Sequence, residues 1–175
     1  MKKILFSTLC LIMTLGLASC GAPSVDVGSA VEESDSEVSD ANETEEEGLS
    51  GDTLGGKLAI EFNNLIKDET NIAKVAEALS DEDFCGYSCG VMDVEEGFLN
   101  GFTEEINGFN EGVAFMPMIG SIPFIGYIFE TDDVEGLKDT LLSKADPRWN
   151  ICTQADETVC ITSGGYVFFT MCPEE

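Results

Sequence analysis

The chain of 175 residues contains no histidine, so the side chains left for chemistry are carboxylates, thiols, lysines and tyrosines. Nucleophile pairs built on histidine and histidine-ligated metal sites are therefore excluded. The chain has 34 Asp and Glu against 8 Lys and Arg, and its formal net charge is −26. Nucleic acid is an unsuitable partner for such a chain, because Lys and Arg are the residues that hold a phosphate backbone.

Thiol chemistry would come from the cysteines that follow the N-terminal region, namely Cys85, Cys89, Cys152, Cys160 and Cys172. Cys152 and Cys160 flank a predicted turn at residues 155–157, which would allow a disulfide across two strands. Cys85 and Cys89 form a second candidate disulfide pair in a glycine-bracketed loop, and the odd count leaves at least one free thiol. The alternative is that these cysteines are reduced and act as small buried apolar residues. A four-thiolate zinc site ranks below both, because paired C-x-x-C spacing is absent.

Carboxylates gather between residues 91 and 111, where acids occur without a base: Asp93, Glu95, Glu96, Glu104, Glu105 and Glu111. Oxygen ligands in such number could hold a hard cation. No segment matches the EF-hand pattern. The most similar segment begins at Asp81 and has Cys85 and Met92 at positions where an EF-hand has oxygen ligands. We therefore assign no metal site and no cofactor from the residues.

The segment Gly86-Tyr87-Ser88-Cys89-Gly90 matches the G-x-S-x-G pattern of the α/β-hydrolase nucleophile elbow. That chemistry needs a histidine to accept the serine proton and a larger scaffold built on a parallel sheet. Ser88 is therefore not a nucleophile of this kind, and no catalytic residue is assigned.

The first twenty residues have the pattern of an export signal. Two lysines precede an uncharged apolar run at residues 4–17, which is shorter than the roughly 20 residues that a membrane-spanning helix needs. The next residues, Leu17-Ala18-Ser19-Cys20, resemble the lipobox of bacterial lipoproteins. The resemblance implies that residues 1–19 are a removable signal peptide and that the Cys20 thiol carries a diacylglyceryl group. Two acyl chains would anchor the chain to the cell membrane on its extracytoplasmic face.

Residues 20–52 are expected to form a disordered acidic linker behind the lipidated cysteine. Residues 21–52 carry eleven acids and no base, so this stretch repels itself and cannot bury a core. As a flexible coil it would span about 30 Å and hold a domain away from the bilayer surface. The layout is similar to that of small surface lipoproteins of Gram-positive bacteria, whose C-terminal domains carry no assigned activity.

Residues 53–175 are long enough for one domain with a core. Apolar spacing predicts two short helices or one broken helix between Leu58 and Leu79. A further helix is predicted to begin at an Asp132–Glu135 capping box and to stop near Ala145, ahead of Pro147. Strands are predicted at residues 91–94, 113–118, 124–130, 158–162 and 166–172. The expected fold is α+β, with an antiparallel or mixed sheet and two or three helices packed on one face in two layers.

Arg148 and Trp149 are the only arginine and the only tryptophan of the chain. We expect Trp149 to close the core where a helix leads into a strand, and Arg148 to pair with an acid. The alternative role for Trp149 is to stack on a bound ligand.

The sequence thus favours a non-catalytic interaction or accessory module, held at the membrane through Cys20, whose partner is a protein or a small solute. Two alternatives stay open: a small cell-surface enzyme that uses carboxylates or a thiol, and a lipoprotein that binds a cation or small solute.

Overall fold

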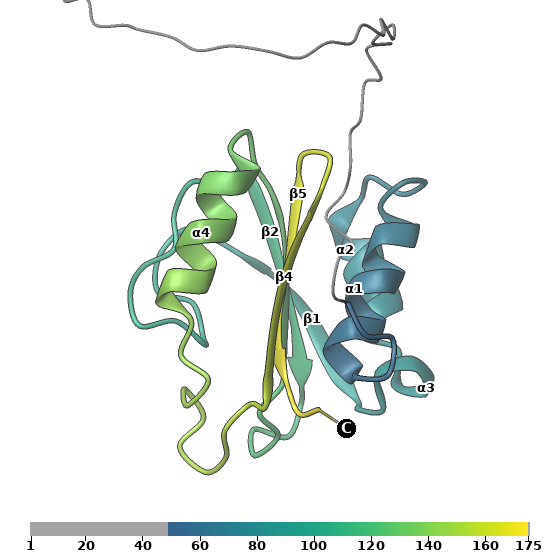
Figure 1. Ribbon diagram of the computed structural model, residues 1–175, viewed down its shortest axis with the longest axis vertical. Coiled ribbons are helices and arrows are strands. Elements are labelled where there is room, and N and C mark those ends of the chain that lie inside the picture. The colour runs from purple at the N-terminus through teal and green to yellow at the C-terminus, as the bar shows by residue number, and fades with distance from the viewer. Residues whose placement is uncertain (1–48, 175) are drawn as a thin grey trace, which may run out of the picture. The chain divides into compact units, whose positions relative to one another are not determined.

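Helices precede and interrupt the strands along residues 49–174, the part of the chain that the computed structural model describes (Figure 1). The helices are α1 (Leu54–Leu65), α2 (Ile72–Leu79), α3 (Glu82–Cys85) and α4 (Val134–Lys144). The strands are β1 (Cys89–Val94), β2 (Glu111–Pro117), β3 (Ile125–Glu130), β4 (Glu157–Ser163) and β5 (Tyr166–Cys172). The predicted signal peptide 1–19, Cys20 and the linker as far as residue 48 lie outside the described residues.

The strands form one five-stranded sheet with the order β1-β2-β3-β5-β4, and every neighbouring pair is antiparallel. This result confirms the predicted α+β class and the antiparallel sheet. The chain leaves β3 through α4 and returns as the β4–β5 hairpin. The second strand of this hairpin, β5, pairs with β3. The hairpin turns at Gly164, whose φ of 59° lies in the left-handed region that glycine adopts without strain.

Helices cover both faces of this sheet. One apolar cluster joins α1 and α2 to inward side chains such as Phe115 and Phe168, and the other joins α4 to side chains such as Tyr127 and Phe169. Figure 1 shows the sheet between α4 on one side and α1 with α2 on the other. The expectation of helices on one face thus holds for α1 and α2, whereas α4 lies on the opposite face.

The burial of the central strands explains why the second face needs a cover. Residues 125–129 of β3 and residues 167–172 of β5 are buried without interruption. Successive side chains of a strand point to opposite faces, so an unbroken buried run requires packing on both. Here α4 and the segment that precedes β2 supply that packing through Leu137, Leu141 and Ile106.

The start of α1 is fastened to the start of β4. Thr53 caps the helix by accepting a hydrogen bond from the Gly56 N–H at 3.2 Å. The Glu157 carboxylate accepts from the Thr53 hydroxyl at 2.8 Å and from the Gly55 N–H at 3.0 Å. A carboxylate is favourable here, because the first N–H groups of a helix lack partners within the helix.

The later helices begin at side-chain caps. Asn71 accepts from the Lys74 N–H and begins α2 as a separate helix, so the predicted region from 58 to 79 contains two helices. Asp133 accepts from the Gly136 N–H at 3.0 Å and begins α4, one residue after the predicted cap at Asp132. Helix α4 ends at Lys144 with Ala145 as its C-cap, which confirms the predicted stop near Ala145, ahead of Pro147.

Candidate functional site

The described cysteines are all free thiols, and the structure brings one of the two predicted pairs together. Cys85 at the end of α3 and Cys89 at the start of β1 place their Sγ atoms 3.8 Å apart. The predicted pairing of Cys152 with Cys160 across a turn at residues 155–157 is wrong, because β4 begins at Glu157 and pairs with β5. Cys160 consequently lies opposite Phe169, and Cys152 lies in an exposed loop outside the sheet.

Burial suppresses the reactivity of most of these thiols. Desolvation raises the pKa of Cys160 to about 12, although Lys138 acts in the opposite direction. Burial and then the nearby Glu157 carboxylate raise the pKa of Cys172 to about 12. Burial and the adjacent Cys85 raise the pKa of Cys89 to about 12 as well. Because the thiolate is the nucleophile, these three cysteines are poor candidates for the thiol of an enzyme.

We expect Cys85 and Cys89 to form a disulfide when the protein is treated with oxidised glutathione. The two thiols lose two electrons and two protons, and glutathione disulfide is reduced to two glutathione thiols. Sulfur atoms already in contact need only a small movement to bond. Because burial and the adjacent Cys85 raise the pKa of Cys89, the rate of attack by Cys89 should increase with pH in proportion to its thiolate fraction.

Mass spectrometry after alkylation measures this reaction. Peptide mapping of the oxidised protein should show Cys85 and Cys89 joined to each other and not alkylated, and Cys89→Ser should abolish that crosslink. Cys152→Ser is the matched control and should retain it, because Cys152 lies in a different loop. Equal alkylation of the wild-type protein before and after oxidation would show that the pair does not bond.

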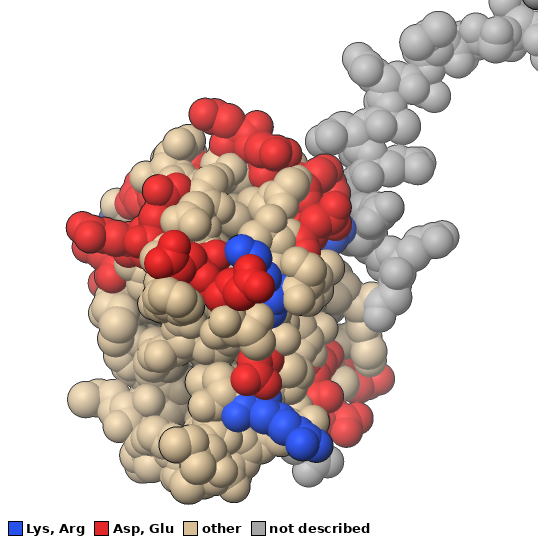
Figure 2. Space-filling model, turned by 90° about the vertical axis from the view of Figure 1, so that its left-hand side faces the viewer, with Lys and Arg blue, Asp and Glu red and all other residues tan. Residues whose placement is uncertain are grey.

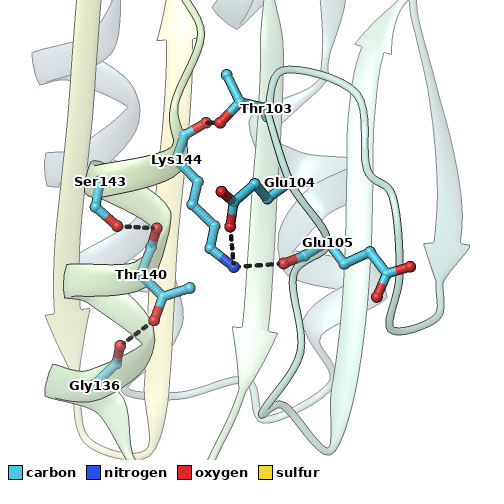
Figure 3. Close-up of polar contacts among 7 residues, drawn as sticks. All are labelled: Thr103, Glu104, Glu105, Gly136, Thr140, Ser143 and Lys144. Atoms are coloured by element: carbon cyan, nitrogen blue, oxygen red, sulfur yellow. Dashed lines mark hydrogen bonds and ion pairs between the residues drawn. The ribbon is translucent and has the colours of Figure 1, made fainter.

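The predicted acidic segment is held by structural contacts (Figure 3). Lys144 at the end of α4 donates from Nζ to the Glu105 carbonyl at 2.8 Å and forms an ion pair with Glu104 at 3.5 Å. Thr103 donates from its backbone N–H and its hydroxyl to the Lys144 carbonyl. Glu96 accepts from the Gly108 N–H at 2.7 Å. Over residues 49–174, no three His, Cys, Asp or Glu side chains gather in an arrangement that could hold a metal ion.

The G-x-S-x-G pattern lies in a helix-to-strand connection. Ser88 follows α3 and precedes β1, whereas a nucleophile elbow leads from a strand into a helix. Ser88 uses its carbonyl to accept from the Met118 N–H at 3.0 Å, which fastens the β2–β3 loop to β1. The structure thus gives Ser88 a position unlike that of a catalytic elbow.

A hollow of about 410 Å³ opens where the β2–β3 loop meets the loop between α4 and β4. Its lining residues are uncharged: Asn100, Met116, Pro117, Gly120, Ile122, Phe124, Ile125, Trp149, Asn150, Ile151 and Cys152. Asn150 donates from Nδ2 to the Gly120 carbonyl at 2.8 Å, and Thr153 donates to the Ser121 carbonyl at 2.9 Å. These bonds hold the two loops together and thereby define the hollow.

Trp149 belongs both to this hollow and to the core. Its half-buried side chain packs against the apolar cluster under α4 and also lines the hollow. The neighbouring Arg148 donates from Nε to Gln154 at 3.0 Å, where the sequence predicted an acid as its partner. Both interpretations of Trp149, closure of the core and a surface for a ligand, are thus compatible with its position.

The rim of the hollow is apolar and strongly exposed. Ile151 is 100 % exposed, Met118 78 % and Ile119 66 %, which makes them three of the four most exposed large apolar side chains among residues 49–174. Residues 53–175 contain 23 acids and six bases, yet none lines the hollow. Figure 2 shows acidic side chains gathered on the upper part of one face and an uncharged area at its lower left.

The sequence analysis identified Trp149 but missed the hollow and its rim. The signal was present as two runs without charge, residues 112–129 and 149–155, in a chain rich in acids. The first run forms β2, β3 and the loop between them. Within residues 49–174, no helix has the length and apolar character needed to cross a bilayer.

Comparison with known proteins leaves the site to be judged on its own geometry. No protein family model, no curated protein and no solved structure matches the chain.

Proposed function

We propose that the chain is a lipid-anchored bacterial protein of the extracytoplasmic membrane face, and that its folded domain is a non-catalytic binding module. The observation that carries the second part is the uncharged hollow with its exposed apolar rim. Exposed apolar side chains grouped around a concave surface are typical of sites that bind other molecules.

The chemistry of the lining favours binding over catalysis. Amide and apolar groups and the thiol of Cys152 line the hollow, and no carboxylate, lysine or tyrosine does. A nucleophilic cysteine needs an adjacent base or positive charge, and the lining gives Cys152 neither. General acid–base catalysis needs a titratable group within hydrogen-bond reach of the reacting atoms. Apolar walls with a few amide groups supply contact area and orientation without proton transfer.

The lipobox-like residues Leu17-Ala18-Ser19-Cys20 support the proposed anchor. One buried acyl chain gives only marginal membrane binding, whereas two chains hold a protein stably. The excess of acids opposes attraction to an anionic bilayer surface, so lipid rather than charge would supply the membrane affinity.

Cys20→Ala is expected to remove the protein from the membrane fraction or to leave the unprocessed precursor. Cells fed an alkyne-labelled fatty acid should label the wild-type chain and not this variant. Cys10→Ala is the matched control, because Cys10 lies within the apolar run before the lipobox and should leave labelling unchanged. Equal labelling of the Cys20→Ala chain and the wild-type chain would refute the anchor.

A further inference from the structure

We infer, resting on the proposed binding function, that the hollow takes a small uncharged aromatic molecule seated against Trp149. This inference adds the chemical class of the ligand to the proposed function. Three properties of the hollow support it: its size, its lack of charge and its sole tryptophan.

The size of the hollow favours a small molecule over a macromolecule. Its volume of about 410 Å³ lies in the lower part of the range of roughly 300–1,000 Å³ that is usual for small-molecule sites. A stable protein partner needs about 800 Å² of surface on each side. The hollow is a concave apolar site between two loops, so it suits a small molecule better than a protein partner.

The charges of the domain exclude ionic ligands from the hollow. An ion that left water for this site would find no side chain of opposite charge in the lining. Desolvation of an unpaired charge is strongly unfavourable. The many acids elsewhere on the domain also repel an approaching anion. An uncharged ligand meets neither obstacle.

The lining offers aromatic and polar contacts to such a ligand. Trp149 and Phe124 supply aromatic surface, and aromatic rings stack favourably in offset or edge-to-face arrangements. Asn100 adds a side-chain amide that bonds no other side chain or backbone group of the described residues. The Asn150 amide is already engaged by the Gly120 carbonyl and by the Cys152 N–H. A hydroxyl or carbonyl group on the ligand could therefore pair with Asn100.

Three probes that share a nitrophenyl ring and carry a neutral, an anionic or a cationic substituent test this inference: 4-nitrobenzyl alcohol, 4-nitrobenzoate and protonated 4-nitrobenzylamine. Nitroaromatic rings quench tryptophan fluorescence, and Trp149 is the sole tryptophan of the chain. The mature chain in phosphatidylcholine vesicles should show saturable quenching by the alcohol at pH 7. The anion and the cation should bind at least about tenfold more weakly, because neither finds a counter-charge.

One aspartate substitution on the rim and one away from it supply a matched comparison. Ile151 lines the hollow and is fully exposed, so Ile151→Asp should leave the fold intact and weaken binding of the alcohol about tenfold. Ile60 in α1 is also exposed but belongs neither to the hollow nor to its rim, so Ile60→Asp should leave binding unchanged. Circular dichroism of both variants checks that the domain is folded.

Several results would overturn the inference. They are non-saturable quenching by the alcohol, equal affinity for the anion, and equal effects of the two aspartate substitutions. Quenching of Trp149 by brominated acyl chains in the vesicles would identify the bilayer as the occupant instead. Sedimentation with the vesicles reports separately on the anchor. If the protein does not sediment with them, the same titration in free solution still tests the hollow.

Discussion

The folded domain is expected to lose stability steeply as the pH rises above 9. Burial raises the pKa of Cys160 and Cys172 from 9.0 to about 12. Between these values the unfolded chain releases the two thiol protons, whereas the folded chain retains them. Each thiol therefore lowers the free energy of unfolding by about 1.4 kcal/mol per pH unit. At pH 11 the two thiols together remove about 5 kcal/mol, which is comparable with the whole stability of many domains.

Tyr127 should add to this loss at higher pH. Its hydroxyl donates to the Asn100 carbonyl at 2.8 Å from within the core. Burial raises the pKa of Tyr127 above its ordinary value of 10.0, and the hydrogen bond only partly opposes this shift. The sign is the same as for the thiols: the folded state retains a proton that the unfolded state releases above pH 10.

Denaturant unfolding under reducing conditions, repeated between pH 7 and pH 11, measures this dependence. Cys160→Ala should reduce the slope of stability against pH by about 1.4 kcal/mol per pH unit above pH 9. Cys152→Ala is the control for loss of a cysteine outside the core, because Cys152 lies in an exposed loop. The explanation fails if the Cys160→Ala variant and the wild-type protein lose stability in parallel.

Local sequence patterns predicted most of the elements but not the face that each helix covers. The spacing of Leu58 and Phe62 showed which side of α1 is apolar, and Leu137 and Leu141 did the same for α4. An apolar side indicates that a helix packs against another element, but it does not predict which face of the sheet the helix covers. That choice depends on the crossover from β3 through α4 to the β4–β5 hairpin, which only the assembled sheet shows.

The difference between local and long-range contacts also explains why the Cys85–Cys89 pair was predicted and the hollow was not. Cys85 and Cys89 are four residues apart, so a short connection suffices to bring their sulfur atoms together. Cys152 and Cys160 also look symmetric along the chain, but β4 takes its partner from β5 instead. The hollow depends on contacts such as Asn150 with Gly120, 30 residues apart, which no local spacing reveals.

Gly126→Val is expected to destabilise the domain by about 3 kcal/mol, the usual upper range for overpacking a core. Gly126 lies in β3 opposite Phe115 of β2, and the Phe115 ring covers the glycine. A Cβ at position 126 would collide with Cζ of that ring. The ring cannot move away freely, because it packs against Phe124 at 5.8 Å and against Phe168 at 6.5 Å between ring centroids.

Gly90→Val is the matched control in β1. A Cβ at Gly90 would meet no atom within 4 Å, and β-branched residues suit strands, so this variant should be neutral or slightly more stable. Denaturant unfolding of both variants gives the comparison. Equal losses at the two positions would show that loss of glycine itself, rather than the collision with Phe115, is responsible.

A double-mutant cycle isolates the contact between Gly126 and Phe115. Phe115→Ala alone should cost about 3–5 kcal/mol, because it empties a fully buried site. In that background Gly126→Val should no longer destabilise, since the valine enters space that the ring has left. The two changes should therefore differ from additivity by about 3 kcal/mol. Additive losses would mean that the Phe115 ring moves away from the valine in the single variant. The contact between Phe115 and Gly126 would then not restrict the size of the residue at position 126.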